Sequence, residues 1–161
     1  MKNTMKLIII CILIFSPHFA DEAELYDLST KLEEHSIQKS NIQLVLKADK
    51  DIYGVQFDIS YNSAQLILDD DAIISNIPGN KIYSSIKGDG IARILILSLT
   101  GEKLLDATTD SIADLIHIPF QSAGKFRGTS FVELFDITLA GRAGLEVDLK
   151  SYSPYIFEVS F

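Results

Sequence analysis

The segment 51–61, with the sequence DIYGVQFDISY, carries the pattern that most constrains the fold of this chain. Apolar side chains occupy every second position, at Val55, Phe57, Ile59 and Tyr61. The positions between them carry small or polar side chains: Gly54, Gln56, Asp58 and Ser60. Alternation with a period of two, built on β-branched and aromatic residues, is typical of a strand with one buried face. The sequence therefore predicts a strand whose first set of side chains enters a core, while the second set faces away from it.

The same criteria predict strands along most of the chain. Residues 42–48 also alternate, and the turn signal at 49–51 predicts that this strand forms a hairpin with the next one. Further strands are expected at 81–86, 91–99, 111–121, 130–139 and 155–161. Turn signals rich in Gly separate them, and no helical segments alternate with them. This pattern predicts one all-β domain with the architecture of an antiparallel sandwich.

Three segments leave alternatives open. Residues 21–36 fit both a helical stripe and a strand, and the strand is favoured because a sandwich needs its first edge paired. Pro119 cannot donate a ladder hydrogen bond, so segment 111–121 lies at an edge or carries a bulge. The strand at 91–99 is apolar on both faces, with Ile94 and Ile96 on one and Leu95 and Leu97 on the other.

The N-terminus has the features of a secretory signal peptide. Lys2 and Lys6 precede nine consecutive apolar residues, Leu7–Phe15, and a small residue follows at Ala20. A bilayer span needs about 20 apolar residues, so this run is too short to remain in a membrane. We expect cleavage after residue 20 and a single exported domain at 21–161. Because Cys11 leaves with the signal peptide, that domain contains no cysteine and depends on core packing.

Composition and residue types exclude several classes of function. The chain has 14 Lys and Arg against 22 Asp and Glu, a net charge of −8, which disfavours binding to nucleic acid. His35 and His117 have no nucleophile motif beside them, so no catalytic residue is expected. No Cys/His metal spacing occurs, and the run 69–71 of three Asp is typical of a solvated turn. We expect no cofactor on this chain.

From Asn41 onward, the order of features resembles the cohesin module, the scaffold-protein domain that receives dockerins in cellulose-degrading assemblies. The segment 53–61, YGVQFDISY, is similar to the family's "G-F-Q-F-x-L-x-Y-D-P" strand and turn, although Asn62-Ser63 replaces Asp-Pro. Segment 91–101 resembles the middle strand with its glycine turn. Segments 110–124 and 132–140 are similar to the family motifs "D-G-V-L-A-x-I-x-F-x-V…G" and "I-x-L-x-D-V-x-L-A". The resemblance covers roughly residues 40–161.

This resemblance implies a nine-stranded jelly-roll sandwich that is an extracellular, non-catalytic binding module for a dockerin-type protein, in a polysaccharide-degrading or surface assembly. Calcium would then belong to the partner rather than to this chain. The family's dockerin-contacting Asn and Asp fall on Gly54, which offers no side chain, and on Gln56, which carries no charge. The partner-binding face that we expect is formed by six residues: Gly54, Gln56, Asp58, Ser60, Ile94 and Ile96.

A different class of function uses the same sandwich. Because fold alone does not fix function, a carbohydrate-binding or cell-surface adhesion domain is the alternative. A sugar-binding face normally offers an aromatic platform. The chain has no Trp, and the aromatic residues most expected to be exposed are Tyr53, Tyr83 and Tyr152. Binding to polysaccharide without a protein partner would favour this alternative.

Overall fold

The structure, a computed structural model, describes residues 22–27, 41–108, 112–149 and 155–161. Ten strands lie in these ranges: β1 (Glu22–Asp27), β2 (Asn41–Ala48), β3 (Gly54–Tyr61), β4 (Leu66–Leu68), β5 (Asn80–Gly88), β6 (Ile91–Ser98), β7 (Ile112–Ser122), β8 (Thr129–Ala140), β9 (Glu146–Leu149) and β10 (Tyr155–Ser160). The helical segments in these ranges are two short 3-10 turns, η1 (Asp70–Ala72) and η2 (Arg142–Gly144). No helix in the described ranges is long and apolar enough to cross a membrane.

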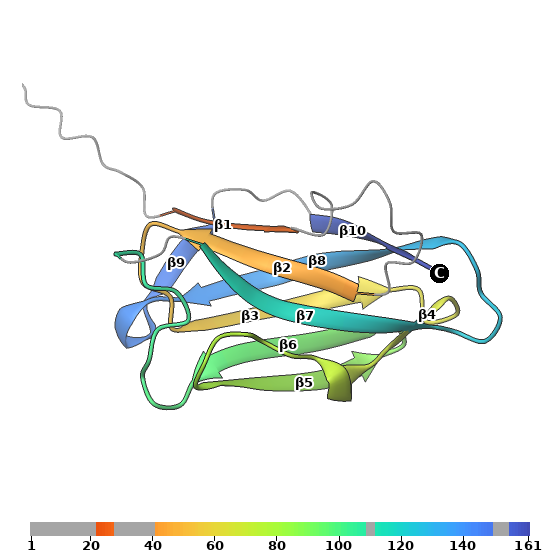
Figure 1. The fold of residues 1–161 in the computed structure, drawn as a ribbon, viewed down its shortest axis with the longest axis horizontal. Coiled ribbons are helices and arrows are strands. Elements are labelled where there is room, and N and C mark those ends of the chain that lie inside the picture. Colours follow the sequence, from red (N-terminus) through yellow and green to blue (C-terminus); the bar gives the residue numbers. More distant parts are fainter. Residues whose placement is uncertain (1–21, 28–40, 109–111, 150–154) are drawn as a thin grey trace, which may run out of the picture.

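The strands form two layers that are joined along one side (Figure 1). One layer has the strand order β4, β7, β2, β1, the other has the order β8, β3, β6, β5, and β9 links β1 to β8. β10 pairs with the first half of β8, along the edge whose other end pairs with β9. Neighbouring strands are antiparallel except β1 and β9, which are parallel. The expected all-β sandwich is confirmed, with one strand more than the nine that the resemblance implied.

The expected hairpin between residues 42–48 and 51–61 is wrong. β2 pairs with β1 and β7, whereas β3 pairs with β6 and β8, so the two consecutive strands lie in opposite layers. A turn signal marks the end of a strand but does not determine which strand will lie beside it. Each strand has one apolar face, and placing them in opposite layers buries both faces in the same core.

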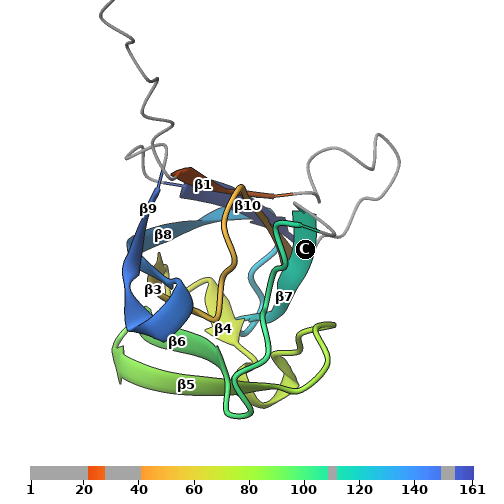
Figure 2. The same ribbon diagram turned by 90° about the vertical axis from the view of Figure 1, so that its left-hand side faces the viewer.

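Side chains from both layers fill one core. The expected core positions in β3 are confirmed, because Val55, Phe57 and Ile59 are at most 1% exposed. Tyr61 is half-buried, and its ring packs edge-on against Phe120 of β7 with the ring centroids 5.4 Å apart. Figure 2, which looks along the strands, shows the two layers and the linking strands β1 and β9 around this core.

The segment with Pro119 carries a bulge and is not an edge strand. It forms β7, which lies between β2 and β4. Leu44 pairs with Ile116 but Val45 pairs with Asp114, so the ladder between β2 and β7 skips one residue of β7. Pro119 lies beside the end of β4, where its carbonyl accepts a hydrogen bond from the Asp69 N–H at 3.2 Å. Because β4 ends at Leu68, the missing N–H of the proline leaves no ladder bond unmade.

Some expectations fall on residues outside the described ranges. These are the signal peptide at residues 1–20, with Cys11, and the side chains of His35 and Tyr152. Within the ambiguous segment 21–36, residues 22–27 form β1, which confirms the strand there, and 28–36 lie outside the described residues.

Candidate functional site

The outer face of β8, β3, β6 and β5, called the outer face below, carries the residues that the sequence places opposite the core. Residues in register on neighbouring antiparallel strands point to the same side of a sheet, so the outward side chains form rows across the strands. From β5 to β8, the rows are Lys81, Leu97, Gly54 and Ala140; then Tyr83, Leu95, Gln56 and Thr138; then Ser85, Arg93, Asp58 and Phe135. Ser60 follows in a fourth row, between Ile91 and Glu133.

The expected positions Ile94 and Ile96 do not belong to this face. Both side chains are 0% exposed and lie in the core, paired with Phe57 and Val55. Leu95 and Leu97 are the β6 residues that face outward. Arg93 is the sequence signal that identifies this side, because it shares the parity of the two leucines and a charged side chain seldom enters a core.

Asp58 belongs to the outer face but is covered there. It is only 4% exposed, and Arg93 holds both of its carboxylate oxygens, with Nε donating to Oδ1 at 2.6 Å and Nη2 donating to Oδ2 at 2.8 Å. Lys87 Nζ donates to Oδ2 at 3.3 Å. The hydrogen bonds from Arg93 keep the pKa of Asp58 below its ordinary value of 3.8, although burial acts in the opposite direction. This carboxylate therefore organises the surface and is not free to act as a base.

A hollow of about 400 Å³ lies in the outer face beside Gly54. Gly54 and Ala140 form its floor, and its walls include Leu95 and Leu97 on one side and Tyr53 on another. The hollow exists because Gly54 has no side chain. A Cβ at that position would lie 3.5 Å from the Ala140 Cβ and 3.6 Å from the Ile96 carbonyl oxygen, which are ordinary contacts. Gly54 thus determines the shape of the surface without any unusual backbone conformation.

The apolar part of the outer face extends from the hollow to the edge strand β5. Tyr83 is 51% exposed and lies beside Leu95, which confirms the exposure expected for this tyrosine. Tyr53, also expected to be exposed, is half-buried at the rim of the hollow. Buried apolar groups ringed by polar ones are typical of protein–protein contacts. The outer face is therefore shaped to bind another surface rather than to enclose a small substrate.

The histidine at position 117 lies on the opposite layer and makes structural contacts. His117 Nε2 lies 3.0 Å from Asp114 Oδ2, and Asn41 Nδ2 lies 3.3 Å from His117 Nδ1. Asn76 Nδ2 donates to the same Asp114 oxygen at 2.8 Å. Burial acts to raise the pKa of Asp114, but hydrogen bonds from His117 and Asn76 outweigh it and leave the pKa below its ordinary value. These partners are amides and a carboxylate, so they provide no nucleophile for the imidazole to activate.

The acidic residues do not form a metal centre in the described part of the chain. No group of three or more His, Cys, Asp or Glu residues there is arranged to hold a metal ion. Asp69, the first of the three consecutive Asp residues, accepts a hydrogen bond from Gln121 Nε2 at 2.8 Å, and the other two lie in η1. Elsewhere, Lys103 Nζ lies 2.9 Å from carboxylate oxygens of both Asp51 and Asp106. An ammonium group thus occupies the position between these two carboxylates.

Sequence reasoning missed the contribution of β8 and η2 to the hollow. Ala140 and Thr138 reach it because β8 pairs with β3, and Ala143 reaches it because η2 folds back over the end of β3. Alternation shows which side chains of one strand share a face, but not which strands are neighbours. Small side chains at Gly54, Ala140 and Ala143 were the available signal, although each is unremarkable by itself.

Comparisons with known proteins give a consistent result at the level of the fold. No family model and no curated protein sequence matches this chain. Among solved structures, a cohesin module from a family 33 glycoside hydrolase of Clostridium perfringens aligns with a TM-score of 0.61 and 18% identity, over 88% of this chain and 97% of that one.

Two further cohesin structures align almost as well. The cohesin–dockerin complex Coh-OlpA–Doc918 of Clostridium thermocellum gives a TM-score of 0.57 and 16% identity, over 87% of this chain and 99% of that one. A non-cellulosomal cohesin of the archaeon Archaeoglobus fulgidus gives 0.55 and 13%, over 87% and 92%. The chain therefore has the cohesin fold, as the resemblance in its sequence implied.

Proposed function

We propose that this chain is an exported, non-catalytic docking module that binds a dockerin-type protein through its outer face. The observation that carries the proposal is the apolar surface formed by Tyr83, Leu95 and Leu97 around the hollow at Gly54. Burial of such a surface supplies affinity, and the polar groups around it set the register of the contact. The cohesin fold supports a dockerin-type partner, since solved cohesins of this fold include complexes with dockerins.

Two residues of the expected binding face retain their role in this proposal. Gly54 forms the floor of the hollow, and the half-buried Gln56 lies beside Leu95 in the next row. Asp58 acts through its ion pairs with Arg93 and Lys87, which fix the height of the surface beside the hollow. Ser60 lies at the far end of the face, beyond the ion pairs. Leu95 and Leu97 replace Ile94 and Ile96.

The experiment is calorimetric titration of the protein with a panel of dockerin modules, with and without calcium. We expect one or more dockerins to bind only when calcium is present, because calcium would order the dockerin. Gln56→Arg and Leu95→Asp should abolish this binding. Gln43→Arg is the matched control, because Gln43 is also half-buried in the middle of a strand but belongs to β2 in the opposite layer.

Two results would contradict the proposal. One is unchanged dockerin binding by a folded Gln56→Arg variant. The other is retention of the protein on insoluble polysaccharide together with indifference to every dockerin, which would favour the carbohydrate-binding alternative.

Export is the second part of the proposal, and the basic start and apolar run of residues 1–20 support it. N-terminal sequencing of the protein recovered outside the cytoplasm should begin near Asp21. Recovery of a chain that still begins at Met1, in the membrane fraction, would contradict the expected cleavage.

A further inference from the structure

Charged residues on the outer face are segregated by strand. β5 and β6 contain Lys81, Lys87 and Arg93 and no Asp or Glu. The strands beyond β3 show the opposite composition. β8, β9 and β10 contain no Lys, Arg or His, and their acidic residues are Glu133, Asp136, Glu146, Asp148 and Glu158. β3 lies between the two groups and has a single charged residue, Asp58. The sheet therefore changes from basic to acidic across its strands.

Several of these charges remain available to a partner. Asp58 is shared by Arg93 and Lys87, so this cluster carries one excess positive charge. Lys81 is exposed and makes no ion pair within the described residues. On the acidic side, Glu158 is exposed and Glu133 is half-buried, and neither forms an ion pair with another described residue. An approaching surface thus meets positive charge along β5 and β6 and negative charge along β8 and β10.

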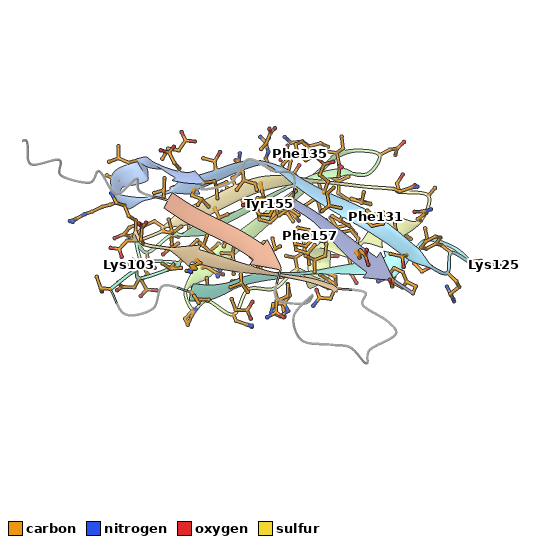
Figure 3. All side chains as sticks on the ribbon, turned by 90° about the horizontal axis from the view of Figure 1, so that it is seen from above. Lys103, Lys125, Phe131, Phe135, Tyr155 and Phe157 are labelled. Carbon is orange, nitrogen blue, oxygen red and sulfur yellow. The ribbon has the colours of Figure 1, made fainter. Side chains whose placement is uncertain are left out.

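The acidic side also carries exposed apolar side chains. Phe131 of β8 is 57% exposed and Ile156 of β10 is 60% exposed. In the pairing of these two strands, Phe131 lies opposite Glu158 and Ile156 lies opposite Glu133, so apolar and acidic groups alternate across the surface. Figure 3 shows Phe131 and Phe135 on β8, with Tyr155 and Phe157 on the neighbouring β10. Apolar groups next to unpaired carboxylates favour a partner segment in which apolar and basic side chains are mixed.

The hollow lies between the basic and the acidic strands. Lys81 and Leu97 lie on its β5 side, whereas Ala140 and then Glu146 continue the same row on its other side. Its floor and walls are apolar, and its volume of about 400 Å³ is ample for one large side chain. Because a polar group placed there would lose water without gaining a hydrogen-bond partner from Gly54, Ala140 or the leucines, the hollow selects an apolar side chain.

From this arrangement we infer the chemistry of the partner surface, an inference that rests on the docking role proposed above. The partner inserts one large apolar side chain into the hollow at Gly54. It places carboxylates toward Lys81 and the Arg93–Lys87 cluster, and it places ammonium or guanidinium groups toward Glu133 and Glu158. Turning the partner by half a turn about the hollow would bring like charges together on both sides. The charge pattern therefore permits one orientation of the bound partner.

The probes for this inference are three cross-linked helical peptides of equal length, each with a central Leu. The first has Glu residues on one flank and Lys residues on the other, the second has Glu on both flanks, and the third has Lys on both flanks. Their binding to the full ¹⁵N-labelled chain is followed by amide chemical shifts. We expect the first peptide to bind about tenfold more tightly than the other two, since it forms favourable rim pairs on both sides of the hollow. The advantage should disappear at about 0.5 M salt.

Matched variants assign the effect to individual groups. Lys81→Glu should weaken binding of the first peptide and strengthen binding of the peptide with Lys on both flanks. Lys125→Glu is its control, since it makes the same charge change in the exposed turn between β7 and β8, at the far end of the sandwich from Lys103 (Figure 3). Gly54→Ala should retain most binding, whereas Gly54→Leu should abolish it by filling the hollow.

The outcomes separate the two proposals. Equal affinity for all three peptides, or no binding of the first at millimolar concentration, would overturn the inferred partner chemistry. So would a Lys81→Glu variant that behaves like Lys125→Glu. If a dockerin binds the protein and Lys81→Glu leaves that binding unchanged, the docking role stands and the inferred charge pattern is rejected. If no dockerin binds but the first peptide is preferred, the charge pattern stands and the partner is not a dockerin.

Discussion

Neighbouring residues Leu95 and Ile96 of β6 offer a direct test of the register on which the outer face depends. Ile96 is 0% exposed and packs in the core, whereas Leu95 faces outward beside the hollow. Replacing either by Ala removes three carbon atoms. At about 0.8 kcal/mol for each buried group, the transfer loss for Ile96→Ala is about 2.4 kcal/mol. A cavity closed on all sides adds to this loss, so we expect about 3 kcal/mol, within the range of about 2–5 kcal/mol known for such substitutions.

Leu95→Ala removes the same number of atoms but leaves no closed cavity, because the outer face opens to water. We therefore expect a loss of about 1 kcal/mol in the free energy of unfolding. For a urea slope of about 2 kcal/mol/M, the midpoint should fall by about 1.5 M for Ile96→Ala and by about 0.5 M for Leu95→Ala.

Binding should show the reverse order of effects. Ile96→Ala keeps the outer face and should retain partner capture at a temperature where it is folded, whereas Leu95→Ala should lose most of it. Equal urea midpoints for the two variants, or a larger loss of stability for Leu95→Ala, would refute the register of β6.

Two further predictions concern Asp58 and Gly90. Because the pKa of Asp58 lies below its unfolded value of 3.8, its ion pairs stabilise the protein above that pH and this contribution is lost as the pH falls through the lowered folded pKa. The difference in unfolding free energy between the native protein and Asp58→Asn should thus shrink between pH 7 and pH 3, and a constant difference would contradict this. Gly90→Ala should destabilise the protein at least twice as much as Gly101→Ala. Both glycines have a positive φ, which costs an alanine about 1–2 kcal/mol, but only at Gly90 would the new Cβ also collide with the Tyr61 carbonyl oxygen. Equal losses in urea unfolding would show that this collision is relieved.

The sequence was sufficient to predict the layer architecture and the phase of β3. Phe57 and Gln56 follow the alternation because each apolar side chain in that strand has a polar neighbour on either side. β6 lacks this contrast, since four consecutive aliphatic residues make both of its faces apolar, and the choice of Ile94 and Ile96 was wrong for that reason. Arg93 carries the missing information, because its charge shows which face of β6 meets water.

Features that depend on contacts between distant segments could not be derived from the sequence. The turn after Ala48 does not reveal that the chain crosses to the other layer, because the same residues serve equally well in a hairpin. The hollow requires Gly54, Ala140 and Ala143 to come together from β3, β8 and η2. Likewise, the ion pair between Asp58 and Arg93 depends on the register of β3 against β6, which no local pattern determines.

The parallel pairing of β1 with β9 has a consequence for how the chain reaches its native state. Glu22 at the start of the domain lies beside Asp148 near its end, and β10 completes the edge of β8 only when the last residues are present. Contacts this distant in the chain must overcome a large loop-closure entropy, and folds dominated by them form in milliseconds to seconds. At a synthesis rate of about 5–20 residues per second, most of the chain is made before its closing strands exist. The polypeptide therefore leaves the ribosome without a complete sandwich, a state in which an unfolded chain can still be threaded through a narrow channel.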